Sequence, residues 1–185
     1  MKKIKPDYKW LSKITIFAFV ASIALNMVTS IVVNDLYIGI AFIVLILVIL
    51  MGIFFDVIGL AVATAVETPF HARATKRING SKESIILIRN ADKVSSFCND
   101  VIGDIAGVIS GGLAASIIVK IQTQLPASAG VALNLILTAL VSAFTIGGKA
   151  CCKNIAMSKS FFIVEKCGYI VYKFKTLFRF TEREK

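Results

Sequence analysis

The sequence predicts an all-α, polytopic membrane protein with four transmembrane helices, a cytoplasmic helical hairpin beside the membrane and a basic C-terminal interfacial helix. Three observations predict this fold class. The 185 residues are 57% apolar and 17% charged, whereas soluble domains are about half apolar and about a quarter charged. The apolar residues gather in four blocks of membrane-spanning length, and nearly all positive charges lie in every second connection. A soluble globular domain is therefore excluded.

Each apolar block is long enough for a membrane-spanning helix. About 20 helical residues cross a hydrocarbon layer of ~30 Å. The run 40–50 is apolar on every side, as expected for a helix in lipid. The alternating segments of about ten residues that a β-barrel needs are missing from the sequence. The four spans are expected at about 14–33, 37–62, 97–119 and 127–147.

A basic arm, residues 1–13, precedes the first span. This arm and the apolar block after it also resemble a secretory signal peptide. The block is longer than the apolar region of a typical signal peptide, and no clear small-x-small cleavage site follows it. We therefore expect the first span to be retained, with cleavage as the alternative.

The positions of Lys and Arg predict the orientation of the chain. Of the 21 Lys and Arg residues, five lie in 1–13, six in 64–96 and nine after residue 147, and Lys120 is the remaining one. Positive residues close to spans stay on the cytoplasmic side. We expect a multi-pass protein of the cell membrane, inner or plasma, with both termini in the cytoplasm. Its net charge of +10 then needs no nucleic-acid partner.

The cytoplasmic connection 64–96 is too polar to span a membrane, and its pattern predicts a helical hairpin. Thr68-Pro69 is typical of an N-cap followed by proline at the first helical position. Asn79-Gly80 is a turn signal, and Ser81 is expected to cap a second short helix. The hairpin should lie against the inner leaflet and lead into the third span.

The segment 154–185 mixes aromatic and basic side chains, among them Phe162, Lys166, Tyr169 and Lys173. This composition is typical of a helix that lies in the membrane interface. We expect a surface anchor here. A lipid- or ligand-sensing element is the alternative.

Three aspartates lie within the expected spans: Asp56 late in the second, and Asp100 and Asp104 early in the third. Ionisable groups in a membrane are costly and mark functional sites. The two spans run in opposite directions, so all three carboxylates should lie in the cytoplasmic half. Together with the amide oxygen of Asn99, they form a candidate site for a hard divalent cation such as Mg²⁺.

Two alternatives to a cation site remain open. Asp100 lies close to the expected end of its span, where a carboxylate can be solvated at headgroup level. Lys149, which follows the fourth span, is a candidate ion-pair partner for Asp104. In either case the carboxylates would be neutralised or solvated without a metal ion.

The sequence contains no enzyme signature. It has no phosphate-cradling glycine loop, no H-E-x-x-H and no G-x-S-x-G. We predict no catalytic residue and no organic cofactor. The four cysteines fall on the reducing side of the expected topology, so disulfides are not expected: they are Cys98, Cys151, Cys152 and Cys167.

A stripe of small residues runs along the third span. Gly103, Gly107 and Gly111 repeat at four-residue spacing, which lets helix backbones approach closely. The stripe is expected to pack against another helix of the chain or to form a face of a homodimer. Pore lining is a weaker alternative.

Short motifs in three places resemble the transmembrane domain of the cyclin-M/CorC/CorB family of magnesium and cobalt transport proteins. Phe54-Phe55-Asp56 resembles the family's F-F-S, and Thr64-Ala65-Val66-Glu67 resembles its S-x-x-E, so two alignments are open. The pair Asp92-Lys93-Val94 and Ile102-Gly103-Asp104 is similar to P-D-R-x-L…I-G-N. The segment 148–156 is similar to G-E-x-x-P-K-x-x-A.

This resemblance implies a homodimeric inner-membrane protein that handles Mg²⁺ or Co²⁺. Its ion ligands would fall at Asp56, Asp104 and Gly148. The family's nucleotide-sensing CBS pair has no room after the fourth span, and Lys149 stands where the family has glutamate.

Two functional hypotheses follow. In the first, the chain transports a divalent cation, or serves such transport, through the metal ligands Asp56, Asn99, Asp100, Asp104 and Gly148. In the second, it is a non-transporting membrane scaffold or regulator in which Lys149 neutralises the ion site.

Overall fold

The computed structural model describes residues 8–35, 37–122 and 127–181, and all of its regular secondary structure in these ranges is helical. The predicted all-α class is confirmed for this part of the chain. Within the basic arm, residues 1–7 lie outside the described residues, as do the connection 123–126 and the tail end 182–185. In chain order the elements are α1 (Tyr8–Asp35), α2 (Ile38–Thr64), α3 (Thr68–Thr75), α4 (Ser81–Arg89), α5 (Ala91–Ser96), the π-helix η1 (Phe97–Ile102), α6 (Gly103–Gln122), α7 (Ala127–Ser158) and α8 (Ser160–Thr181).

Three helical stretches of the described chain are long and apolar enough to cross a membrane. They are Ile38–Thr64, Ala91–Gln122 and Gly130–Ser158. They cover the third predicted span, 97–119, and most of the second, 37–62, and of the fourth, 127–147. The first predicted span, 14–33, lies in α1, where the apolar stretch among the described residues is the shorter Ser12–Ala24. The chain is thus a membrane-type helical protein with three helices of spanning length among its described residues, and the first predicted span, 14–33, stays a prediction.

The chain divides into two compact units. One consists of residues 1–52 and 101–146, and the other of residues 53–100 and 147–185. The division falls inside α2, η1 and α7. Each unit is described below by itself.

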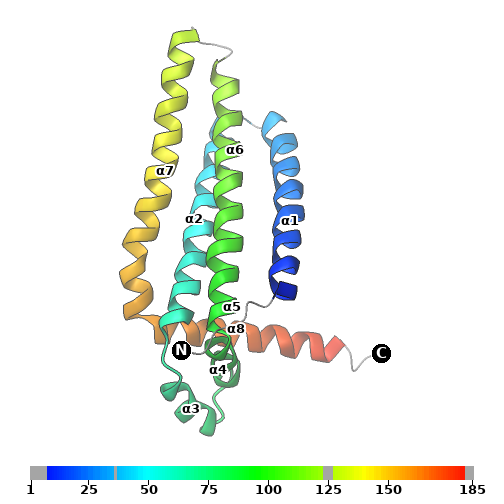
Figure 1. Cartoon of the computed structure of the whole chain (residues 1–185), viewed down its shortest axis with the longest axis vertical. Coiled ribbons are helices and arrows are strands. Elements are labelled where there is room, and N and C mark those ends of the chain that lie inside the picture. Colours follow the sequence, from blue (N-terminus) through cyan, green and yellow to red (C-terminus); the bar gives the residue numbers. More distant parts are fainter. Residues whose placement is uncertain (1–7, 36, 123–126, 182–185) are drawn as a thin grey trace. The chain divides into compact units, whose positions relative to one another are not determined.

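In the first unit, α6 packs against α1 and the early part of α2. Figure 1 shows α1 alongside α6. A Cβ atom on Gly52 of α2 would lie 3.0 Å from the Cβ of Ala106, and one on Gly112 of α6 would lie 3.0 Å from Asn26 Oδ1 of α1. Glycine at both positions therefore allows a close approach of the helices.

The opposite face of α6 is open. Gly107 and Gly111 are exposed, and a Cβ atom added to either would meet nothing within 4 Å. Two members of the small-residue stripe therefore do not pack against a described helix of the same chain. The third, Gly103, is buried.

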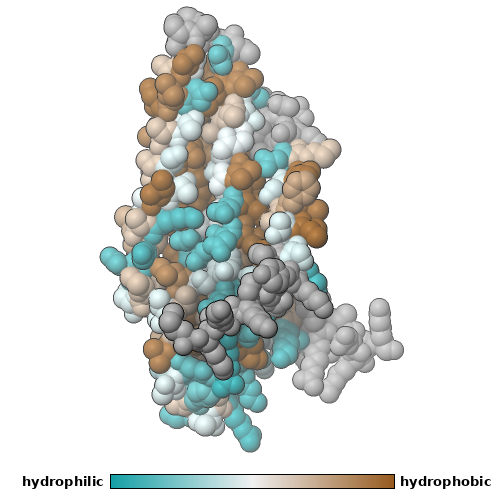
Figure 2. Space-filling model, in the orientation of Figure 1, coloured by the Kyte–Doolittle hydropathy of each residue, from teal (hydrophilic) through white to brown (hydrophobic). Residues whose placement is uncertain are grey.

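The part of α7 in the first unit carries a largely apolar surface, and Figure 2 shows hydrophobic residues over much of its visible side. Monomeric soluble proteins rarely expose so large an apolar surface. It is compatible with contact to a lipid bilayer. The exposed apolar side chains are Val131, Leu135, Ile136, Leu140, Phe144 and Ile146.

The second unit contains the α3–α4 hairpin, which Figure 1 shows as two short helices joined by a turn. Glu67 occupies the N-cap position of α3, with Thr68 as the first helical residue and proline in the first turn. The prediction of Thr68 as N-cap is therefore one residue late. The α4 N-cap is Gly80 in place of the predicted Ser81, because the turn needs the left-handed backbone that glycine adopts at φ 88°.

The C-terminus of α3 ends in a Schellman motif. The N–H of Arg77 donates to the carbonyl of Ala74 (3.0 Å), and the N–H of Ile78 donates to the carbonyl of Arg73 (3.2 Å). The left-handed residue of this motif is usually glycine. Here it is Arg77, at φ 55°.

The hairpin packs against α8 through two glycines. A Cβ atom on Gly80 would lie 2.7 Å from Tyr169 Cα, and one on Gly168 would lie 2.7 Å from the carbonyl oxygen of Gly80. The buried hydroxyl of Ser84 is placed to donate to the carbonyl of Gly80 (3.0 Å) or to that of Val164 in α8 (3.2 Å). These contacts fix α8 across the start of α4.

The core of this unit joins α2, the hairpin, α7 and α8. The Phe70 ring is buried and packs against the Phe161 ring, with 4.8 Å between centroids. Figure 2 shows hydrophilic residues over the outside of the hairpin. The buried core residues are Ala61, Val62, Phe70, Ile85, Ala156 and Val164.

The fourth span, expected at about 127–147, is the first part of a longer helix. The predicted boundary, between residues 153 and 154, lies inside α7, which continues to Ser158. No proline interrupts 148–158, so each added residue keeps its helical hydrogen bond. The helices meet at Lys159, next to Ser158, whose hydroxyl bonds back to the Ile155 carbonyl (3.4 Å). Such serine back-bonding often bends helices.

Candidate functional site

The candidate site in the second unit is an ion pair between two apolar helices. Lys149 Nζ of α7 lies 3.4 Å from Asp56 Oδ1 of α2. The side chains are 30% and 24% exposed, respectively. The sequence suggested Asp104 as the partner of Lys149, whereas the structure brings Lys149 to Asp56.

A glycine allows α7 to approach α2 at this point. A Cβ atom on Gly148 would collide with the side chain of Ile53, which lies three residues before Asp56. Gly148 therefore has a packing role that brings the neighbouring Lys149 close to the carboxylate. Its role as a metal ligand stays a prediction.

A second polar group lies between α2 and η1. Asn99 Nδ2 donates to Ser95 Oγ (3.3 Å), and Asn99 Oδ1 is buried without a donor among the described residues. The amide lies over Gly59, where any Cβ atom would overlap Oδ1. The π-helical turn that carries Asn99 is a rare form often found at functional sites.

The other two predicted acidic ligands are on the surface. Asp100 in η1 and Asp104 in α6 are both exposed, and neither has an ion pair among the described residues. Their expected shared face assumed 3.6 residues per turn. The π-helix η1, which ends just before Gly103, has more residues per turn than an α-helix. The four-residue spacing of Asp100 and Asp104 therefore no longer predicts that they share a face.

No group of three or more His, Cys, Asp or Glu residues that could hold a metal ion occurs in the described part of the chain. At Asp56 the residues do not fit a resident divalent cation, because the Lys149 ammonium already faces the carboxylate. The predicted ligand set therefore stays a prediction: it consists of Asp56, Asn99, Asp100, Asp104 and Gly148.

Outside the apolar helices, a network of charged side chains connects the two ends of the hairpin and joins it to α8. Glu67 Oε1 accepts from Arg89 Nε at 2.7 Å and lies 2.8 Å from His71 Nε2. The hydrogen bond from Arg89, more than that from His71, lowers the pKa of Glu67 below its ordinary 4.5, against a smaller opposing effect of desolvation. Arg73 pairs with Glu165 of α8 at 2.7 Å.

Sequence reasoning missed the glycines that position these groups. Gly59 and Gly168 each stand in a helix where glycine is unfavourable, by roughly 1 kcal/mol relative to alanine. An isolated glycine inside a helical pattern was therefore the available sequence signal for a close helix contact. The partner helix could not be read from it, because partner choice depends on tertiary packing.

Comparison of the chain with protein-family models, with curated proteins and with solved structures gives no match in any of the three.

Proposed function

We propose that the chain is a non-transporting membrane scaffold in which Lys149 takes the place of a bound cation. In this proposal four spans hold the protein in the cell membrane with both termini in the cytoplasm. The α3–α4 hairpin and α8 lie at the cytoplasmic membrane surface, where their basic side chains face anionic lipid.

The observation that supports this function is the 3.4 Å contact between Lys149 Nζ and Asp56 Oδ1. A carboxylate within an apolar helix needs a positive partner, and here the chain supplies one. A divalent cation would have to displace a covalently attached ammonium group. The pair therefore favours a fixed structural charge over a site that loads and releases an ion.

The test is Mg²⁺ binding by Lys149→Glu. This change replaces the ammonium with a second carboxylate beside Asp56, which is the ligand type that Mg²⁺ prefers. We expect the purified variant to gain thermal stability in millimolar Mg²⁺ through ligand linkage, and the original protein to gain none. Lys153→Glu is the matched control, because Lys153 is an exposed lysine of the same helix. A Mg²⁺ response of the original protein equal to that of Lys149→Glu would contradict the proposal.

A second candidate function is divalent-cation transport, which the resemblance to the cyclin-M/CorC/CorB family suggests. The observation that favours it is the buried Asn99 Oδ1, which has no donor among the described residues and has the chemistry of a cation ligand. Proteoliposomes that carry the protein should then take up Mg²⁺, and Asp104→Asn should slow this uptake. Absence of uptake in both proteins would reject transport.

A further inference from the structure

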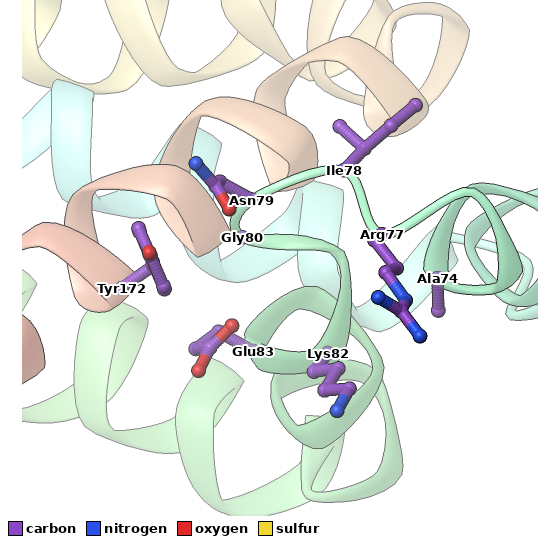
Figure 3. Close-up of a pocket in the computed structure, with 8 residues that line it drawn as sticks. All are labelled: Ala74, Arg77, Ile78, Asn79, Gly80, Lys82, Glu83 and Tyr172. Atoms are coloured by element: carbon purple, nitrogen blue, oxygen red, sulfur yellow. The ribbon is translucent and has the colours of Figure 1, made fainter.

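We propose that the turn between α3 and α4 forms a binding site for a phosphate group. A cavity of about 450 Å³ opens between this turn and α8, within the usual size range of small-molecule sites. Figure 3 shows Arg77 and Lys82 on the turn side, with Glu83 between Lys82 and Tyr172 of α8 in this view. The site lies outside the apolar helices and does not depend on the Asp56–Lys149 pair.

The backbone of Arg77 is the first argument for a ligand. Arg77 occupies the left-handed position of the Schellman motif at φ 55°, where a side chain is disfavoured and glycine is the usual residue. Arg77 nevertheless occupies this position, and its side chain lines the cavity. Strained residues of this kind cluster at ligand-binding sites.

The balance of charge in the cavity is the second argument. Arg77 and Lys82 both line it, and neither has an ion pair among the described residues. The one carboxylate of the lining, Glu83, lies 3.9 Å from Lys175 Nζ of α8. Two positive charges thus remain for a ligand.

The rigidity of the walls is the third argument. The close contact of Gly80 with Tyr169 and the bonds of Ser84 join the turn to α8 beside the cavity. A site held by such contacts is largely formed before a ligand arrives, which lowers the entropic cost of binding.

The chemistry of the donors selects the ligand class. A guanidinium binds two oxygens of one phosphate at once, and an ammonium adds a point charge. A phosphate monoester or free phosphate carries enough negative charge to match both. Two sources supply such a group: inorganic phosphate in solution, and the headgroup of phosphatidate in the membrane.

The experiment measures binding of labelled inorganic phosphate and of soluble dihexanoyl phosphatidate to the full chain in detergent. Dihexanoyl phosphatidylcholine, which offers no monoester, is the negative probe. Binding of both phosphates identifies a general phosphate site, binding of phosphatidate alone identifies a lipid headgroup site, and binding of inorganic phosphate alone identifies a soluble ligand. Binding of neither overturns the proposal.

Arg77→Gly is the decisive variant, because it removes the guanidinium and places the favoured residue at the left-handed position. We expect it to unfold at the same temperature as the original protein or higher, and to bind the phosphate probe about tenfold more weakly or worse. Lys82→Ala should weaken binding by a similar factor. The matched control is Lys76→Ala, since Lys76 is exposed and next to Arg77 but does not line the cavity. Equal loss of binding in Lys76→Ala and Arg77→Gly, or full binding by Arg77→Gly, would overturn the site.

Discussion

At the scale of single residues, the three aspartates predicted as ligands are either paired with a positive charge or exposed at the surface. Asp56 is paired with Lys149 at 3.4 Å, whereas Asp100 and Asp104 are exposed. A charged residue at the centre of a membrane helix costs about 2.5–3.5 kcal/mol on insertion scales. Removing one member of a close pair leaves the other to bear such a cost alone.

The pair predicts a non-additive effect of substitutions on stability. Lys149→Met should lower the free energy of unfolding by about 1–3 kcal/mol, because it leaves the Asp56 carboxylate without its positive partner. Adding Asp56→Leu should recover most of this loss, since no unpaired charge then remains. Denaturant unfolding in mixed micelles measures both, and the double-mutant cycle gives the coupling energy.

The control for this cycle is Lys153→Met, which removes an exposed lysine of the same helix. Its effect on unfolding should stay within about 0.5 kcal/mol. If Lys149→Met unfolds at the same denaturant concentration as Lys153→Met, the ion pair does not stabilise the protein.

At the scale of elements, the sequence predicted helices well and their ends less well. Long apolar runs predict membrane helices because each backbone group in lipid must bond within its own helix. The positions at which helices begin and end depend on smaller free-energy differences. Gly80 is the N-cap in place of the expected Ser81 because the turn needs a left-handed backbone there, at φ 88°. The helix α7 continues to Ser158 because no proline interrupts 148–158.

Glu67 connects the start of α3 to the end of α4 through its contact with Arg89. This contact predicts an acid-sensitive contribution to stability. The folded state lowers the pKa of Glu67 from 4.5, chiefly through the hydrogen bond from Arg89. The folded state thus favours the carboxylate, so this contribution is present above pH 4.5 and is lost as the pH falls through the lowered pKa. Thermal unfolding of the full chain in detergent between pH 7 and 3 should show Glu67→Gln losing less stability at acid pH than the original protein.

Asp92→Asn is the matched control for this experiment, because Asp92 is an exposed carboxylate with no ion pair among the described residues. It should follow the pH profile of the original protein. A profile of Glu67→Gln that coincides with both would show that the Glu67–Arg89 contact adds nothing to stability.

At the scale of the whole molecule, the sequence predicted the class of the protein better than its site. Composition and apolar blocks sum over many residues, so single errors cancel. A ligand site needs particular atoms within a few ångströms, and this depends on packing details such as the glycine contacts at Gly59 and Gly148 and the π-helical turn at Asn99. The sequence shows all five proposed ligands, but it does not reveal that Lys149 faces Asp56.

The open face of α6 gives the last prediction, which concerns assembly. Gly107 and Gly111 are exposed with nothing within 4 Å of an added Cβ, and small residues at four-residue spacing let two membrane helices pack closely. We propose that this face joins two copies of the chain. Gly111→Leu should then shift the protein in detergent from dimer to monomer without lowering its unfolding temperature, because no described neighbour of the same chain has to move. Light scattering of the purified protein measures the mass. Gly39→Leu is the control, since Gly39 in α2 also has open space around it but lies outside the stripe, and it should leave the mass unchanged. An original protein that is already monomeric would contradict the dimer, and a dimer that persists in Gly111→Leu would place the contact on another face.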